Sequence, residues 1–130
     1  MNLLIRFFTL FIIFCSTHSL ADYKWEKVST NIQGDVFYID TSSIKKVGNN
    51  AYYFRLADYI IPNNNGELSA IIYFETNCND LSFRYLRDNY FMKPMGRGEP
   101  STIYNEKSEW QSSKKGSSGE SIRKFVCQFN

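Results

Sequence analysis

The chain has 130 residues, with 15 Lys and Arg against 13 Asp and Glu. This near-balanced charge argues against an electrostatic nucleic-acid binder, which carries a basic excess on one face. The length suffices for one domain and not for two.

The first 21 residues are typical of a secretory signal peptide. Arg6 is followed by an apolar run from Phe7 to Cys15, and Ser19 and Ala21 are the small residues that a signal peptidase recognises. We predict cleavage between Ala21 and Asp22, so that 1–21 is the signal peptide and 22–130 the single exported domain. The mature protein would then reside in the periplasm or at the cell surface.

Membrane anchoring is less well supported than cleavage. The apolar segment 3–15 would span roughly 20 Å as a helix, short of a hydrocarbon core of about 30 Å. Lipid attachment at Cys15 is disfavoured by the bulky Phe14 directly before it. We therefore expect no transmembrane segment in the mature chain.

Signal removal takes away His18, the only histidine of the chain. Without histidine, Ser/His/Asp and Cys/His nucleophiles, histidine acid–base catalysis and histidine-ligated metals are excluded. We expect no catalytic residue, no metal and no cofactor.

Two cysteines, Cys78 and Cys127, remain in the mature chain. They lack metal-type spacing, and an exported chain favours a disulfide over two free thiols. A bridge that closes a loop of this size would contribute about 4 kcal/mol to stability.

Alternating and turn-forming residues predict strands along most of the mature chain. The expected strands are 23–28, 35–39, 51–61, 68–78, 81–90 and 101–104. A connection at 62–66 makes the two longest an antiparallel hairpin. Asp40 begins a capped helical turn that we expect to run through Lys45, Gly48 begins a sharp reversal, and the polar segment 105–119 is expected to be flexible.

A helix is predicted at the C-terminus. Ser117 and Glu120 have the spacing of a capping box. Apolar residues then recur on one helical face, at Ile122, Phe125, Val126 and Phe129. The predicted fold class is α+β, an antiparallel sheet of five or six strands with a C-terminal helix packed on one face.

Paired carboxylates are the remaining route to catalysis, because glycosidases need only two carboxyl groups. Asp58 and Glu75 lie on the two strands of the predicted hairpin. If they face each other, they form a dyad; otherwise each pairs with a neighbouring base or caps a turn. We favour the second interpretation, since so short a chain implies no substrate cleft.

Aromatic residues make up 17% of the chain, more than a core of this size needs. Most are expected to form cross-strand pairs. Because the helix covers one face of the sheet, the other face is expected to present tyrosines to a partner protein. The protein-binding candidates are Tyr53, Tyr59, Tyr73, Lys45 and Lys46.

Residues along nearly the whole mature part match a known family in order and spacing. The matching residues are Trp25, Tyr38-Ile39-Asp40, Ser43-Ile44-Lys45-Lys46, Gly48, Asn49, Leu56, Asp58, Tyr59, Pro62, Ser69, Glu75, Cys78, Arg84, Leu86, Tyr90, Met95, Gly96, Gly98, Trp110 and Cys127. Together they resemble the surface-adhesin protein E family, small exported proteins of Gram-negative bacteria. The resemblance implies an antiparallel sheet linked to a helix by a Cys78–Cys127 bridge, adhesion to host matrix or serum proteins, and homodimerisation through sheets.

Three hypotheses follow for function. The first is an exported, non-catalytic, adhesin-like protein that contacts host matrix or other extracellular proteins through an aromatic and basic sheet surface. The alternative is a periplasmic inhibitor or chaperone-like partner of a cell-envelope enzyme, with Lys114 and Lys115 reaching into an acidic cleft. A hydrolase that uses carboxylates alone is the least favoured.

Overall fold

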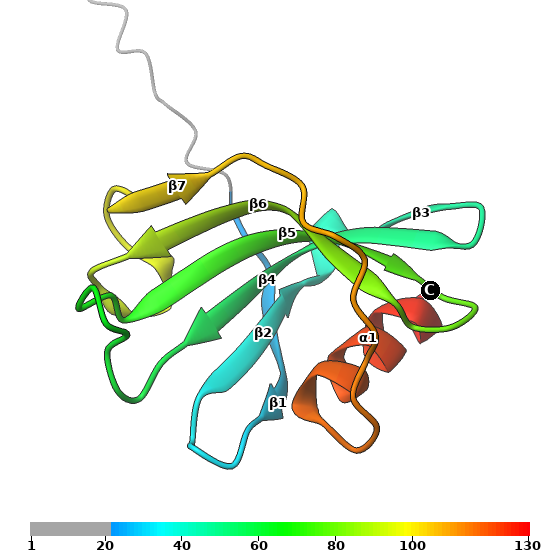
Figure 1. Cartoon of the computed structure of the whole chain (residues 1–130), viewed down its shortest axis with the longest axis horizontal. Helices are drawn as coiled ribbons and strands as arrows, with labels where there is room; N and C mark the ends of the chain where they lie inside the picture. Colours follow the sequence, from blue (N-terminus) through cyan, green and yellow to red (C-terminus); the bar gives the residue numbers. More distant parts are fainter. Residues whose placement is uncertain (1–21) are drawn as a thin grey trace, which may run out of the picture.

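The computed structural model describes residues 22–130, so the predicted signal peptide, residues 1–21, lies outside the described residues. Seven strands, two short 3-10 turns and one α-helix follow one another (Figure 1). The elements are β1 (Trp25–Thr30), β2 (Val36–Asp40), η1 (Thr41–Ser43), β3 (Lys45–Val47), β4 (Asn50–Asp58), β5 (Ser69–Asn77), β6 (Phe83–Phe91), η2 (Pro94–Gly96), β7 (Thr102–Tyr104) and α1 (Ser118–Gln128).

The strands form one antiparallel sheet in which six lie side by side in the order β1-β2-β4-β5-β6-β7. Two strands pair with the same edge of β4: the short β3 pairs with its first residues, 50–52, and β2 pairs with its last residues, 55–58. Between them, η1 is capped by Asp40, which accepts a hydrogen bond from the Ser42 amide. The Ser43 hydroxyl accepts one from the Phe54 amide, so the gap between β2 and β3 is closed by a side chain.

The two faces of the sheet differ in what covers them. Side chains alternate between the faces, and α1 packs on one of them, which we call the helix face. The main core lies there and consists of Ile39, Ala51, Tyr53, Ala70, Ile72, Phe74, Phe83, Ile122 and Val126. The opposite face, which we call the open face, has a smaller buried cluster of Leu56, Ile71 and Phe91, and η2 contacts β4 and β5.

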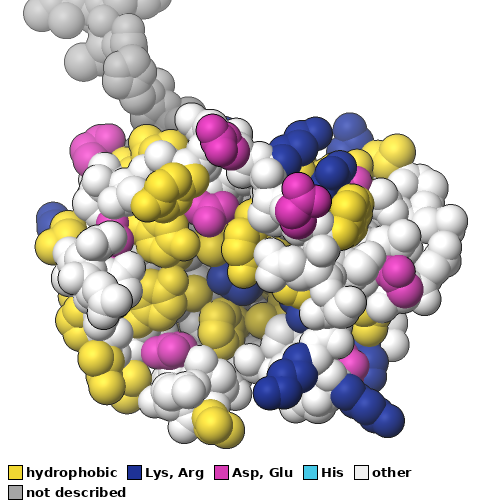
Figure 2. Space-filling model, in the orientation of Figure 1, with side chains coloured by type: hydrophobic (Ala, Val, Ile, Leu, Met, Phe, Trp, Pro, Cys, Tyr) yellow, Lys and Arg dark blue, Asp and Glu magenta, His cyan; other side chains and the backbone are white. Residues whose placement is uncertain are grey.

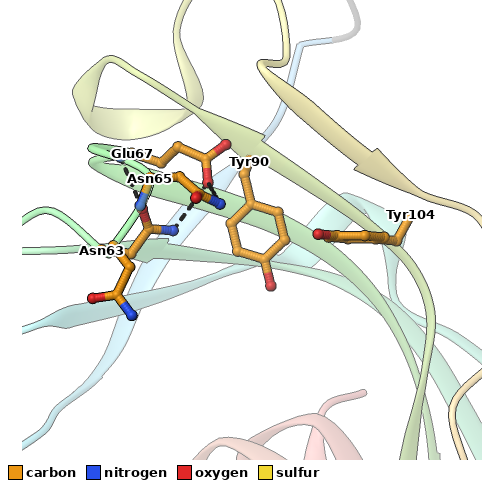
Figure 3. A pocket seen from close by; sticks show the side chains of 6 residues that line it. Asn63, Asn65, Glu67, Tyr90 and Tyr104 are labelled. Carbon is orange, nitrogen blue, oxygen red and sulfur yellow. Dashed lines mark hydrogen bonds between the residues drawn. The ribbon is translucent and has the colours of Figure 1, made fainter.

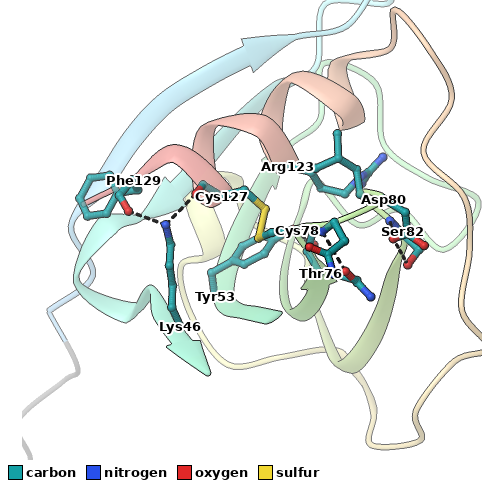
Figure 4. Close-up of a disulfide and its surroundings, with 12 residues drawn as sticks. Lys46, Tyr53, Thr76, Cys78, Asp80, Ser82, Arg123, Cys127 and Phe129 are labelled. Atoms are coloured by element: carbon teal, nitrogen blue, oxygen red, sulfur yellow. Dashed lines mark hydrogen bonds between the residues drawn. A yellow bond between two sulfur atoms is a disulfide. The ribbon is translucent and has the colours of Figure 1, made fainter. Parts of the chain in front are cut away.

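Three devices hold α1 in place, two of them drawn in Figure 4. The Ser117 hydroxyl accepts a hydrogen bond from the Glu120 amide and caps the start of the helix. Cys127 is bonded to Cys78 directly after β5, with 5.6 Å between the Cα atoms. Lys46 donates from Nζ to the carbonyl oxygens of Cys127 and Phe129, at 2.7 and 2.6 Å, where a cation is favoured by the helix dipole.

These contacts confirm the predicted α+β fold, the disulfide and the C-terminal helix on one face of an antiparallel sheet. The expected helical turn is wrong in its extent. It ends at Ser43, because Lys45 pairs with Tyr52 and begins β3.

The polar segment that follows β7 has more backbone structure than the sequence suggests. Ser108 donates its amide to the carbonyl of Tyr85, and Gln111 and Phe83 exchange two backbone hydrogen bonds. This segment therefore runs beside β6 on its way to α1.

Candidate functional site

Five aromatic side chains form a continuous row on the open face, which we call the aromatic strip: Trp25, Tyr23, Phe54, Tyr73 and Tyr52. Ring centroids are 4.7 Å apart for Trp25 and Tyr23, and 5.8 Å apart for Tyr23 and Phe54. Phe54 and Tyr73 follow at 4.7 Å, and Tyr73 and Tyr52 at 6.5 Å. Tyr23 is exposed and the other four are half-buried. The rings support one another at the distances of favourable aromatic pairs, and solvent still reaches them.

Strand periodicity and register build this row. Tyr52 and Phe54 lie two residues apart on β4 and therefore share a face. The register of β4 and β5 places Tyr73 directly opposite Phe54. Trp25 enters from β1, where it pairs with Asp40 at the end of β2. The strip thus crosses several strands of one face.

Basic side chains border the aromatic strip. Lys45 is exposed and pairs with Tyr52 across β3 and β4. Arg87 is exposed, and its guanidinium carbon lies 5.8 Å from the ring centroid of Phe54. A cation over an exposed ring is worth about 0.5–1 kcal/mol. The open face therefore combines aromatic and positively charged groups.

A buried carboxylate fixes one end of the strip. Glu75 accepts hydrogen bonds from the Tyr52 hydroxyl at 2.8 Å and the Asn50 amide at 2.9 Å, and it forms an ion pair with Arg84 at 2.7 Å. Burial alone would raise the pKa of Glu75, but these three donors outweigh it and hold the pKa below its usual value. The ionised carboxylate orients the Tyr52 ring.

The predicted binding residues do not share one surface. Tyr73 belongs to the aromatic strip, and Lys45 lies beside it. Tyr53 is wrong as a contact residue, because it pairs with Phe74, faces α1 and is only 1% exposed. Its hydroxyl forms a buried hydrogen bond with the Thr76 hydroxyl.

Two further candidates also lie away from the strip. Tyr59 is half-buried against the core of the helix face. Lys46 is engaged with the last carbonyl groups of α1. The four other aromatic residues of the strip, Tyr23, Trp25, Tyr52 and Phe54, were not among the candidates. The alternation of Tyr52 and Phe54 along one strand was a usable signal.

The carboxylate dyad considered from the sequence does not form. Asp58 pairs with Ser69 at one end of the β4–β5 hairpin, whereas Glu75 pairs with Tyr52 at the other. At about 3.4 Å per residue, the two carboxyl groups are separated by roughly 20 Å along the strands. Asp58 instead accepts a hydrogen bond from the Met95 amide.

Lys114 and Lys115 lie near the start of α1, where both side chains are exposed. With residues 30–33 and 116–118 they line a shallow groove of about 380 Å³. Within residues 22–130, no group of three or more His, Cys, Asp or Glu side chains is placed to hold a metal ion. No helix in the same range is long and apolar enough to cross a bilayer.

Comparison with known proteins places the fold and the family. Crystal form II of Haemophilus influenzae protein E is similar to the chain with a TM-score of 0.58 and 16% identity, over 79% of this chain and 86% of that one. Protein E from non-typeable Haemophilus influenzae is similar with a TM-score of 0.53 and 16% identity, over 79% and 74% of the two chains. No curated protein sequence matches the chain. The family model for surface-adhesin protein E matches residues 25–128, and the chain therefore belongs to the surface-adhesin protein E family.

Proposed function

We propose that the chain is an exported, non-catalytic binding protein that contacts extracellular proteins, host matrix proteins among them, through the aromatic strip and its basic border. Membership of a family of surface adhesins points to an adhesin-like binding protein. The disulfide agrees with export, because such bridges persist in oxidising compartments.

The observation that carries this proposal is the half-exposed row of rings from Trp25 to Tyr52. Protein interfaces are enriched in Tyr, Trp and Arg at the positions that dominate affinity. Tyr73 lies within the row, with ring contacts to Phe54 and Tyr52, and is the best candidate for such an anchor. Arg87 and Lys45 favour partners with an acidic surface.

The test is binding of purified residues 22–130 to immobilised laminin, fibronectin and collagen, measured by surface plasmon resonance. We expect saturable binding to at least one of them. The Tyr73→Ser variant should weaken that binding about 30-fold or more, the size of a central anchor.

The matched control is Tyr104→Ser, which changes a 55%-exposed tyrosine on the helix face and should leave the affinity unchanged. Equal losses in the two variants, or no loss in Tyr73→Ser, would contradict the proposed surface.

A second candidate function is an inhibitor or chaperone-like partner of a cell-envelope enzyme. It is favoured by the groove that contains Lys114 and Lys115 beside the fully projecting Ile32, which is 99% exposed. Capture of an envelope enzyme by the wild-type chain and not by a Lys114→Ala, Lys115→Ala variant would support this candidate over adhesion.

A further inference from the structure

The part of the helix face that α1 leaves uncovered is hollowed. We call it the tyrosine hollow, and its residues are Phe37, Arg55, Tyr59, Tyr85, Asp88 and Tyr90. The four aromatic members are half-buried against the main core, and α1 lies chiefly over β1, β2 and β4. Figure 2 shows this view of the molecule as a depression with a basic side chain at its floor and hydrophobic side chains around it.

Arg55 is the unusual member of the hollow. Its guanidinium carbon lies 4.7 Å from the ring centroid of Phe74 and 5.2 Å from that of Phe37. Its Nε is buried without a hydrogen-bond partner among residues 22–130, and neither ion pair found in that range includes Arg55. Placing a charge in a partly buried site without a partner is unfavourable for folding. Such a group in a concave site is a candidate for ligand binding.

Two tyrosine hydroxyls near Arg55 are candidates to donate to an anion. Burial raises the pKa of Tyr59, even though Arg55 acts in the opposite direction. Burial, together with the carboxyl group of Asp88, raises the pKa of Tyr90 to about 12. Both hydroxyls therefore keep their protons at neutral pH and can act as hydrogen-bond donors. The Tyr90 hydroxyl already acts on Asp88, whose pKa it lowers by hydrogen bonding, so Tyr59 is the donor available to an anion.

Asp88 lies on the same face as Arg55, on the far side of Ile72, which pairs with both residues. Two strand spacings put their Cα atoms about 10 Å apart. Burial raises the pKa of Asp88, although Arg55 favours the ionised form. Asp88 is only 9% exposed, whereas Arg55 is half-buried, so more of the Arg55 side chain is accessible to a ligand.

A pocket of about 260 Å³ adjoins the hollow at Tyr90 (Figure 3). Tyr104 lines the same pocket and packs edge-to-face against Tyr90, with 6.1 Å between the two ring centroids. Glu67 also lines the pocket, but its carboxylate already accepts hydrogen bonds from Asn63 and Ser101. Asn63, Asn64 and Asn65 complete the lining, so the pocket offers side-chain amide groups as well as the two tyrosine rings to the body of a ligand.

We propose that the tyrosine hollow binds a small carboxylic acid, with Arg55 contacting the carboxylate and the aromatic rings packing against the apolar body. Arginine recognises carboxylates with paired donors, and aromatic faces accept a flat apolar group. This site lies on the opposite face of the sheet from the aromatic strip. A failure to bind carboxylic acids would therefore not contradict the proposed adhesion, and the reverse also holds.

Three probes of similar shape and different charge test the proposal: benzoate, benzamide and benzylamine. Each is titrated into isotope-labelled residues 22–130 with the disulfide formed, and amide chemical shifts are followed by NMR. We expect benzoate to shift the signals of Arg55, Tyr59 and Tyr90 saturably, with Kd on the order of 1 mM, as is usual for so small a molecule. Benzamide and benzylamine should bind about 10-fold more weakly or not at all, because the charge-assisted hydrogen bonds are lost.

Arg55→Met should abolish the preference for benzoate over benzamide. Arg87→Met is the matched control, since Arg87 also lies over an aromatic ring but on the open face, and it should retain the preference. If Arg55→Met does not fold, Arg55→Lys keeps the charge and should retain a reduced preference.

Three results would overturn the proposal. The first is equal binding of benzoate and benzamide, and the second is preferred binding of benzylamine, which would make Asp88 the dominant charge. The third is a set of benzoate-induced shifts confined to the open face.

Discussion

The two faces of the sheet carry similar aromatic side chains, but these side chains differ in how much solvent reaches them. On the helix face, Tyr53 and Phe74 stack with 5.6 Å between ring centroids and are each 1% exposed. On the open face, Phe54 and Tyr73 pair at 4.7 Å and remain half-exposed. Since both pairs sit on the same two strands, strand composition does not decide which aromatic residues become core. The helix does, by covering one face, and its position depends on a few contacts at its ends.

The largest expected effect comes from releasing the helix. Cys78→Ser should lower the free energy of unfolding by about 4 kcal/mol, because the unfolded chain is no longer constrained by the Cys78–Cys127 bridge. Denaturant unfolding followed by circular dichroism measures this loss. Cys127→Ser should give the same value within error, since both variants remove one bond. A loss below about 1 kcal/mol in either variant would show that packing alone holds α1 in place.

A matched pair of isoleucines sharpens the comparison at smaller scale. Ile122 of α1 is 2% exposed in the core of the helix face, and Ile103 of β7 is 53% exposed. Ile122→Ala should lower stability by about 3 kcal/mol through lost burial and a residual cavity. Ile103→Ala should change it by less than about 0.5 kcal/mol. Similar losses from both substitutions would mean that the helix face is not the main core.

The smallest expected effect is a pH dependence that originates on the open face. The pKa of Glu75 is held below its unfolded value of 4.5 by Tyr52, Arg84 and Asn50, which together outweigh burial. The stabilisation from ionised Glu75 is therefore fully present above pH 4.5 and is lost as pH falls through the lowered folded pKa. Thermal melts between neutral and acidic pH should show this decline. Glu75→Gln should make it smaller without abolishing it, because the pKa values of Glu67, Asp80 and Glu120 are lowered as well. A Glu75→Gln variant with the full decline would assign the dependence to other carboxyl groups.

Much of the fold could be predicted from short-range patterns. The alternation along 51–61 and 68–78 predicts β4 and β5, and the spacing of Ser117 and Glu120 predicts the start of α1. Each pattern repeats over several residues and has one dominant physical cause. The short β3, with three residues, is too short to show a period and was hidden by the capping signal of Asp40.

The candidate site was less predictable because it depends on register. Tyr53 and Tyr73 lie on opposite faces, since the hairpin pairs Tyr53 with Phe74, and a shift of one residue would reverse that assignment. The position of Tyr23 beside Phe54 depends on how β1 approaches the sheet, which no local pattern records. The sequence therefore predicted that the exposed surface would be aromatic and basic, but it identified only some of the residues that form it.

Because α1 is attached to the sheet at its last turn, local unfolding of the helix is expected to start from its other end. A helix at a chain terminus ordinarily frays from its free end. Here that end is tied by Cys127 and by the ammonium group of Lys46. Partial detachment is then expected to begin at the Ser117 end, so the last turn of α1, up to Gln128, should exchange its amide protons with solvent later than the first turn.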